Sequence, residues 1–546
     1  MKTTRVGVGS GFRLEVPAWF NYGRDVVDTW AAHDPDAVAL LAVGQSGERA
    51  TALTIAEVSV GSNRAANAFA GLGLGPGAPV FMMLPRVPAW HLAVLGLTKL
   101  GAVPMPGTTL LTPHDIEYRL GRAEARGAIV DAESAAKVQE VAPDLDVKIL
   151  VGEGEAPGPG WRRFDDLLGA SSEAAPDALP TRADDPLLVY FTSGTTGFPK
   201  MVLHTHASYG IGHEITARFW QDLRPGDLHC TLSDTGWAKA AWGTIFGQWR
   251  MRATVFLWDV RGRLDLERLL RTLGRHGVTT FCAPPTVYRQ LVQLDLASFA
   301  KPALRHVVAA GEPLDPETIE RFRSGTGLTI HDGYGQTESV NLVANVPGMH
   351  VRPGSMGKPA PGFEVRIVDA DGEPCAVGEE GNIGVRVKPE RPVGLFREYW
   401  KDPEATAATV VGDWYMTGDL ARRDEDGYLW FVGRADDVIT SSAYRIGPFE
   451  VEAALVSHRA VAEAAVVGKP HPIRGEIVKA FVMLAAGFEP SDELARDIQA
   501  HCKRETAPYK YPREIEFVAE LPKTVSGKIR RVELRERERE RATTRA

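Results

Sequence analysis

A doubly wound α/β fold is predicted by three features of this sequence. Short apolar runs such as Val80–Met83 alternate with longer amphipathic stretches such as Ile55–Ala70 over roughly the first 150 residues. The alternation returns between about residues 207 and 330, a pattern typical of mostly parallel sheets with crossover helices. The 546 residues also exceed what one hydrophobic core accommodates, so two or more domains are expected.

The first block, from Gly23 to about Leu150, predicts helices and strands in turn. The expected helices are Arg24–Ala32, Ile55–Ala70, Ala89–Leu100 and 113–125, and the expected strands are Ala37–Ala42, Val80–Met83 and Ala128–Val130. Thr112 and Pro113 suit the N-cap and first position of a helix. Gly71–Gly75 stands after a helix and before a strand, the reverse of a dinucleotide-binding fingerprint, so we interpret it as a helix stop.

A cluster of hydroxyls and glycines, Thr192–Gly197, ends at Lys200 and follows the apolar strand signal Pro186–Val189. Glycines let backbone N–H groups turn inward, hydroxyls add donors and the lysine adds positive charge, which together suit a polyphosphate. It is not a Walker loop, because Phe198 and Pro199 separate the lysine from the glycine. A flexible surface turn is the alternative. The segment from His206 to Phe219 is expected to be helical.

The second block, about 207–330, predicts helices at Leu264–Leu273 and Pro285–Val292 and strands at Val278–Cys282 and His306–Ala310. Ligands of such open sheets bind beyond the carboxyl ends of the strands, so the residues after them, Gly311–Pro313 and Asp332–Tyr334, are expected beside the phosphate loop. His204 and His206 are spaced as a metal-binding pair, but no third ligand accompanies them.

The pattern changes from Gly362 to about Trp430, where short strands and the turns Asp369–Gly372 and Asp424–Gly427 predict a small β subdomain. A charged link follows, and the remaining residues predict an α+β domain. Its expected helices are Phe449–Leu455 and Asp492–Arg504, and its expected strands are Ala464–Val467 and Val478–Leu484. We therefore divide the chain into residues 1–435 and 436–546. The Arg- and Glu-rich tail from Arg535 is expected to be a solvated helix or disordered.

Composition narrows the class of protein. The net charge of −8 gives no support for binding nucleic acid or a membrane surface, and no run of 18 apolar residues could span a bilayer. The four cysteines lie far apart in the sequence and are too few to stabilise so long a chain by disulfide bonds, which indicates reduced thiols. Met1–Leu14 has no signal-peptide core and too little Arg and Ser for a transit peptide, so a cytoplasmic location is expected.

Five motifs occur in a fixed order: Tyr190–Lys200, Tyr334–Glu338, Tyr415–Asp419, Gly433–Asp437 and Pro522–Lys528. In that order they resemble the adenylate-forming superfamily of acyl-CoA synthetases, luciferases and peptide-synthetase adenylation domains. The stretches that look like its medium-chain acyl-CoA synthetases are Ser233–Trp237, Ser441–Pro448 and Thr506–Arg513. The resemblance, from about Trp19 to Arg531, implies a large adenylation domain of two doubly wound subdomains plus the β subdomain, followed by a small mobile lid domain.

This resemblance implies an AMP-forming synthetase of fatty acid metabolism that uses ATP, Mg²⁺ and coenzyme A. By resemblance, Thr337 bonds the α-phosphate, Glu338 helps bind Mg²⁺, and Lys528 bridges the carboxylate and the α-phosphate. Asp419 takes both ribose hydroxyls, and Arg434 lies near the same ribose. The other residues implied at the nucleotide are Thr192, Ser193, Gly194, Thr195, Thr196, Gly197, Lys200, Gly311, Glu312, Asp332, Gly333, Tyr334, Gly335 and Gln336.

The second step, attack of the coenzyme A thiol, follows in relatives after the small domain swings about a hinge that maps to Asp436. The residues that match the family's coenzyme A contacts are Ser442, Ala443, Tyr444, Arg445, Arg474, Lys503, Tyr511 and Arg513. The family usually has glycine where Ala443 stands, and the added methyl could narrow the thiol tunnel.

The acid-binding pocket is expected to be walled by Trp237 and Pro284 and to reach past Gly335. Acetate-specific relatives have tryptophan at the position of Gly335, so we expect a deeper pocket here and a medium-chain or related acid. An aryl acid such as benzoate, or a short or branched acid, stays an alternative. So do an adenylating enzyme that loads a carrier-protein thiol and a non-catalytic nucleotide-binding protein. The sequence leaves open whether the enzyme prefers ATP or GTP and whether the chain forms a homo-oligomer.

Overall fold

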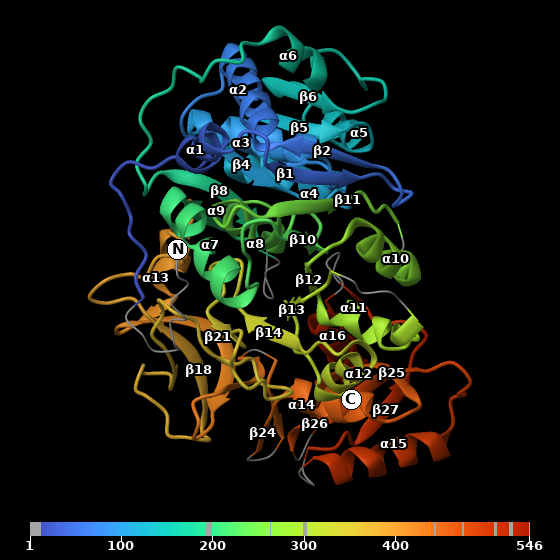
Figure 1. The fold of residues 1–546 in the computed structure, drawn as a ribbon. Coiled ribbons are helices and arrows are strands. Elements are labelled where there is room, and N and C mark those ends of the chain that lie inside the picture. The colour runs from blue at the N-terminus through green and yellow to red at the C-terminus, as the bar shows by residue number, and fades with distance from the viewer. Residues whose placement is uncertain are drawn as a thin grey trace.

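The computed structural model describes residues 12–192, 199–262, 264–298, 303–435, 437–441, 444–471, 474–506, 510–523 and 528–544. The α/β prediction is confirmed: the N-terminal part stacks two α/β layers above a β subdomain, and a smaller α+β unit follows (Figure 1). Among the described helices, none combines the length and the apolar character needed to cross a membrane.

The first sheet is parallel throughout and forms the upper layer of Figure 1. Its strands, in spatial order, are β4 (Val103–Pro106), β3 (Pro79–Met83), β5 (Gly127–Asp131), β6 (Val147–Val151) and β7 (Trp161–Arg163). The helices of this region are α2 (Ile55–Gly71), α3 (Pro88–Leu100), α4 (Pro113–Ala123), α5 (Ala132–Val141) and α6 (Phe164–Ala170). Thr112 caps α4 as predicted, since its hydroxyl accepts from the Asp115 N–H. α2 ends at Gly71, which confirms the helix stop.

The second sheet has nine strands with a parallel centre. Their spatial order is β16 (Lys358–Pro359), β15 (Val343–Ala344), β14 (Ile330–Tyr334), β13 (His306–Ala310), β12 (Thr280–Ala283), β10 (Leu228–Thr231), β11 (Thr254–Trp258), β1 (Val38–Val43) and β2 (Ala50–Thr54). Leu40 of β1 pairs in parallel with Val255 of β11, so a strand of the first block belongs to the sheet of the second block. Periodicity in sequence does not report such long-range pairing.

Helices of the second block include α8 (Ala238–Thr244), α9 (Phe246–Arg250), α10 (Leu266–His276), α11 (Pro285–Leu291) and α12 (Pro316–Thr326). The N-terminal helical stretch consists of residues Tyr22–Asp28 and α1 (Thr29–His33). These bounds agree with the predicted helices to within a few residues.

The predicted phosphate loop joins two antiparallel strands, β8 (Pro186–Phe191) and β9 (Met201–Thr205), and β19 (Glu398–Tyr399) adds to the free edge of β9. The sequence prediction passed from the loop to a helix and gave no bounds for β9, because His204 and Thr205 cut its apolar run to three residues. The helical segments His206–Ile211, α7 (His213–Ile215) and Thr216–Trp220 then follow as expected.

The β subdomain is antiparallel and comprises β17 (Val365–Val368), β18 (Glu380–Arg386), β20 (Val410–Val411), β21 (Trp414–Arg423) and β22 (Leu429–Arg434), with α13 (Pro403–Ala407) beside it. The turn predicted at Asp424–Gly427 is a hairpin, since the Asp424 N–H donates to the Tyr428 carbonyl at 3.0 Å. This hairpin sets Asp419 on β21 opposite Arg434 on β22.

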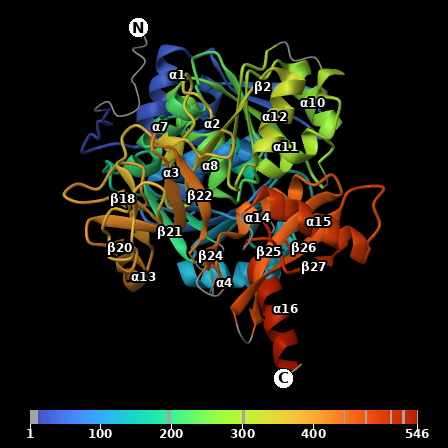
Figure 2. The same cartoon turned by 90° about the horizontal axis from the view of Figure 1, so that it is seen from below.

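The C-terminal unit has its own hydrophobic core and lies to one side of the molecule (Figure 2). Its elements are β23 (Ile439–Ser441), β24 (Tyr444–Ile446), α14 (Pro448–Val456), β25 (Val461–His471), β26 (Gly475–Leu484), α15 (Asp492–Glu505), β27 (Glu514–Phe517) and α16 (Arg531–Thr544). The charged tail is therefore a helix, and it is anchored: the fully buried Glu538 binds Lys479 at 2.7 Å and Arg541 at 2.8 Å. Alternating charge predicted a solvated surface and could not show this buried pairing.

Candidate active site

Asp419 lies at the centre of a buried hydrogen-bond network. Its Oδ2 accepts from the Tyr334 hydroxyl and from Gln336 Nε2, both at 2.6 Å. Its Oδ1 lies 3.4 Å from the Arg434 guanidinium. Burial raises the pKa of the Asp419 carboxyl, whereas Arg434 and the two hydrogen bonds lower it. The structure thus brings together the Tyr334–Gln336 and Asp419 motifs and orients one carboxylate between them.

Two buried rings hold the backbone of Thr337 from behind. His204 Nε2 and the Tyr209 hydroxyl each donate to the Thr337 carbonyl at 2.8 Å. The two rings stack with centroids 3.4 Å apart. Burial lowers the pKa of His204 to about 3, so the ring is neutral at ordinary pH and Nε2 carries the proton that it donates.

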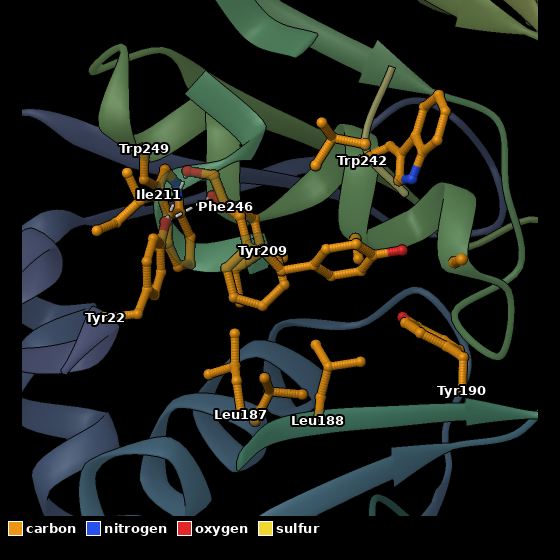
Figure 3. Close-up of a cluster of buried hydrophobic side chains, with 14 of the residues drawn as sticks. Tyr22, Leu187, Leu188, Tyr190, Tyr209, Ile211, Trp242, Phe246 and Trp249 are labelled. Atoms are coloured by element: carbon orange, nitrogen blue, oxygen red, sulfur yellow. Dashed lines mark hydrogen bonds between the residues drawn. The ribbon is translucent and has the colours of Figure 1, made fainter. Parts of the chain in front are cut away.

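The surroundings of Tyr209 belong to the core behind the site. Figure 3 shows its hydroxyl between the indole of Trp242 and the hydroxyl of Tyr190. His206 is the second histidine of the pair that the sequence suggested as metal ligands. It does not contact Thr337 as His204 does; its Nδ1 accepts from the Tyr22 N–H at 3.2 Å. Within the described parts of the chain, three or more metal-ligating side chains gather nowhere.

Glu338 is buried and is held by Tyr399, whose hydroxyl donates to its Oε1 at 2.8 Å. Burial raises the pKa of Glu338, and the Tyr399 hydrogen bond lowers it. Lys200, from the end of the predicted phosphate loop, places its Nζ 4.6 Å from the centroid of the same tyrosine ring. One aromatic side chain therefore touches both the predicted metal-binding carboxylate and the predicted phosphate-binding lysine.

The ends of the phosphate loop meet, because the Thr192 N–H donates to the Lys200 carbonyl at 3.0 Å. Residues 193–198 between them lie outside the described residues. The phosphate contacts predicted for Ser193, Gly194, Thr195, Thr196 and Gly197 therefore stay predictions.

The carboxyl ends of β13 and β14 lie side by side, as expected, with Ala309 paired to Asp332. Glu312, just after β13, accepts from the Thr286 hydroxyl at 2.7 Å. Asp332 is buried, which raises its pKa well above the ordinary value. A Cβ on Gly333 would lie 2.6 Å from the Trp220 ring, so packing alone requires glycine there.

Two lysines approach this edge of the sheet. Lys239 of α8 is half-buried, and its Nζ donates to the Ala310 carbonyl just before Gly311. Burial lowers the pKa of Lys239, and the Lys528 charge lowers it further. The Lys528 charge also acts on Asp419, whose pKa it lowers.

The predicted coenzyme A cations are grouped on the C-terminal unit around one aromatic ring. Arg513 donates to the Tyr511 hydroxyl at 2.6 Å and stacks 4.4 Å from its centroid, and Lys503 Nζ lies 5.3 Å from that centroid. Arg474, also exposed, directly precedes Gly475, the register partner of Ser441. Ser442, Ala443 and Asp436, the predicted hinge residue, lie outside the described residues, as do the side chains of Tyr444 and Arg445.

The acid pocket needs a correction at Gly335. A Cβ there would lie 2.3 Å from the Trp242 ring, so the space expected to be open beside Gly335 is filled by a tryptophan from α8. Trp237 directly precedes α8, and Pro284 directly precedes α11. Trp237 as a wall of the acid pocket stays a prediction. Sequence reasoning did not name Trp242, because its indole comes from a helix whose packing the motif does not show.

The donor set at Glu338 fits magnesium. A hard cation that keeps several waters and phosphate oxygens needs only one or two protein carboxylates. Glu338 would supply one carboxylate, and Lys200, which contacts the same tyrosine, would supply positive charge for the phosphates.

Solved structures share this architecture. The anthranilate CoA ligase AuaEII in complex with anthranoyl-AMP has a TM-score of 0.88 and 31% identity, covering 97% of this chain and 99% of that chain. A benzoate CoA ligase from Burkholderia xenovorans LB400 has a TM-score of 0.83 and 30% identity, covering 94% of this chain and 100% of that chain. The fold and the site thus define an adenylate-forming ligase.

Family comparisons agree. The AMP-binding enzyme model matches residues 27–400, and the model of the AMP-binding enzyme C-terminal domain matches residues 450–528. The mitochondrial acyl-coenzyme A synthetase ACSM3 of Pongo abelii is 46% identical, over 96% of this chain and 91% of the relative. The mitochondrial acyl-coenzyme A synthetase ACSM5 of Homo sapiens is 45% identical, over 96% of this chain and 92% of the relative. The chain belongs to the AMP-binding enzyme family, and its resemblance to the medium-chain acyl-CoA synthetases is confirmed.

The expected cytoplasmic location is wrong. These curated relatives are named as mitochondrial proteins, which contradicts it. The prediction rested on features that Met1–Leu14 lacks, and a missing pattern is a weak guide to location.

Proposed function

We propose that this protein is an AMP-forming acyl-CoA synthetase that activates a medium-chain or related carboxylic acid with ATP and transfers the acyl group to coenzyme A. The observation that carries the proposal is the buried hydrogen-bond network that joins Asp419 to Tyr334 and Gln336, with Glu338 buried two residues further along the same motif. These residues come from two separate motifs, and relatives named acyl-coenzyme A synthetases match along nearly the whole chain.

In the first step, a carboxylate oxygen of the acid forms a bond to the α-phosphorus of ATP, and the bond to pyrophosphate breaks. Both partners are negative, so the protein contributes mainly by neutralising and orienting them. Asp419 would receive the ribose hydroxyls, because an ionised carboxylate only accepts hydrogen bonds. Lys528 would bring positive charge to where the two anions meet, and Thr337 would bond the α-phosphate.

Magnesium would be held by Glu338 together with phosphate oxygens. When bound, it would neutralise phosphate charge and favour the departure of pyrophosphate. Lys200 would add a second positive charge on the same side.

In the second step, the coenzyme A thiol bonds to the acyl carbon and AMP leaves. The cluster of Lys503, Tyr511 and Arg513 supports binding of the 3′-phosphate, since two cations flank one ring. We propose that the unit after residue 435 is the mobile lid and that it turns about Asp436. Arg474 would contribute to the same coenzyme, whereas a carrier-protein thiol would not need this cation cluster.

The class of acid is proposed from the residues that surround Gly335. With Trp242 against Gly335, the pocket cannot extend through that point, so the acyl group would lie along the indole between α8 and the start of α11. An aromatic acid is the second candidate, and the specific support is the likeness to anthranilate and benzoate CoA ligases. A flat ring and a medium-length chain would both suit an indole wall.

The test is pyrophosphate release across a panel of acids from acetate to decanoate, with benzoate and anthranilate, with and without coenzyme A. We expect release that depends on a medium-chain or aryl acid and a thioester product only when coenzyme A is present. Adenylate without thioester would favour the carrier-protein alternative, and no release with any acid would reject the proposal.

A further inference from the structure

We propose that Tyr399 is a positioning residue that sets Glu338 and Lys200 relative to each other for pyrophosphate departure. The proposal deepens the proposed function and rests on it. No sequence motif suggested Tyr399, and the structure singles it out because its side chain touches both charged groups at once.

The segment that carries Tyr399 is attached to both partners through backbone hydrogen bonds. The Phe396 N–H donates to the Glu338 carbonyl at 2.7 Å, and the Trp400 N–H donates to the Met201 carbonyl at 2.7 Å, next to Lys200. Tyr399 itself lies opposite Val202 in the β19–β9 pairing. The strand therefore fixes the distance between the catalytic motif and the exit of the phosphate loop.

The side chain uses its two ends differently. The hydroxyl donates to Glu338 Oε1 at 2.8 Å, which orients the carboxylate and occupies one of its oxygens. The ring face lies 4.6 Å from Lys200 Nζ, an attractive arrangement for an ammonium group. Tyr399 is 7% exposed, and its N–H donates to the Thr406 hydroxyl at 2.9 Å, so it is a rigid support.

This arrangement gives two opposite charges separate partners on one side chain. Glu338 and Lys200 both approach Tyr399, and a direct ion pair between them would withdraw the carboxylate from a cation and the lysine from phosphate oxygens. The phenol gives each charge its own partner, a hydroxyl donor for one and a ring face for the other. The Glu338 carboxylate then stays available to magnesium, and the Lys200 ammonium group stays available to pyrophosphate.

The test compares Tyr399→Phe and Tyr399→Leu with wild type. Tyr399→Phe removes only the hydroxyl, and we expect Mn²⁺ to bind about 10-fold more weakly in the presence of ATP, measured by electron paramagnetic resonance, with a similar rise in the half-saturating Mg²⁺ of pyrophosphate exchange. Tyr399→Leu should add a several-fold rise in the KM for ATP, because the ring face is also lost.

The matched control is Tyr428→Phe. Tyr428 is also buried, its hydroxyl donates to the His350 carbonyl at 2.6 Å, and it lies at the turn between β21 and β22 rather than in the β19–β9 pairing. This variant should keep wild-type Mn²⁺ binding, and thioester formation from supplied acyl adenylate should survive in Tyr399→Phe.

Unchanged Mn²⁺ binding and Mg²⁺ dependence in Tyr399→Phe would overturn the proposal. So would equal loss of both half-reactions together with a lowered melting temperature, which would make Tyr399 a purely structural residue. A wild-type protein that binds Mn²⁺ with ATP but activates no acid would instead reject the proposed function.

Discussion

The proposed nucleotide side and the proposed coenzyme side of this molecule are built differently. At the nucleotide side, Asp419 and Glu338 are 5% and 9% exposed, and fixed donors from tyrosine and glutamine hold them. At the coenzyme side, Lys503 and Arg513 are exposed on the surface of the C-terminal unit and share one tyrosine ring. The two carboxylates of the first region are buried and hydrogen-bonded, and the two cations of the second are exposed to solvent.

This difference predicts which step of the reaction each region controls. Buried, oriented charges act strongly because they need no reorganisation when the transition state forms. Exposed cations act by attraction and are weakened by salt. The nucleotide side should therefore govern the rate of adenylate formation, and the coenzyme side should govern the affinity for coenzyme A.

The largest expected effect is at Lys528, the last residue of the fifth motif. Lys528→Ala should lower adenylate formation by about 10²–10³-fold, since a charge aimed at the reacting phosphate is lost. Thioester formation from a supplied acyl adenylate should be largely spared. Pyrophosphate exchange and single-turnover thioester assays measure the two steps separately, and equal loss of both would contradict this assignment.

A smaller effect is expected at the acid pocket. Trp242→Ala should open the space beside Gly335, so acids longer by about two methylenes gain roughly tenfold in relative kcat/KM at about 0.8 kcal/mol for each methylene. Trp249→Ala is the matched control, because Trp249 is also buried but its Nε1 donates to the Ala39 carbonyl. An unchanged chain-length profile in Trp242→Ala would show that this indole does not limit the pocket.

The coenzyme side should respond more mildly. Lys503→Ala should raise the KM for coenzyme A about five- to tenfold, a loss of roughly 1 kcal/mol for one exposed charge, with pyrophosphate exchange unchanged. Arg504→Ala, the next residue on α15, is the control and should have little effect. With dephospho-coenzyme A, the difference between Lys503→Ala and wild type should disappear. If it persists, Lys503 does not bind the 3′-phosphate.

The last prediction concerns stability rather than activity: the buried Asp332 should make the free energy of unfolding depend on pH. Burial raises the pKa of Asp332, so the folded protein keeps this proton at pH values where the unfolded chain has lost it. The free energy of unfolding should therefore fall as pH rises above about 4, by at most about 1.4 kcal/mol per pH unit from this group. Asp332→Asn should flatten that slope in urea unfolding of the ligand-free protein. An equally steep slope in the variant would show that other groups cause it.

The sequence by itself determined the α/β class, most helix bounds and the chemistry of the ordered motifs. Local features sufficed for these, such as the Thr112 cap, the helix stop at Gly71 and the Asp424–Gly427 hairpin. These are short-range effects of backbone geometry and periodicity, which neighbouring residues control.

The tertiary structure alone decided which distant segments meet. It placed β1 beside β11, and it anchored the charged α16 through the buried Glu538. It also filled the space at Gly335 with Trp242 and set Tyr399 between Lys200 and Glu338. Such contacts depend on close packing between elements far apart in the chain, and neither local propensity nor motif spacing contains that information.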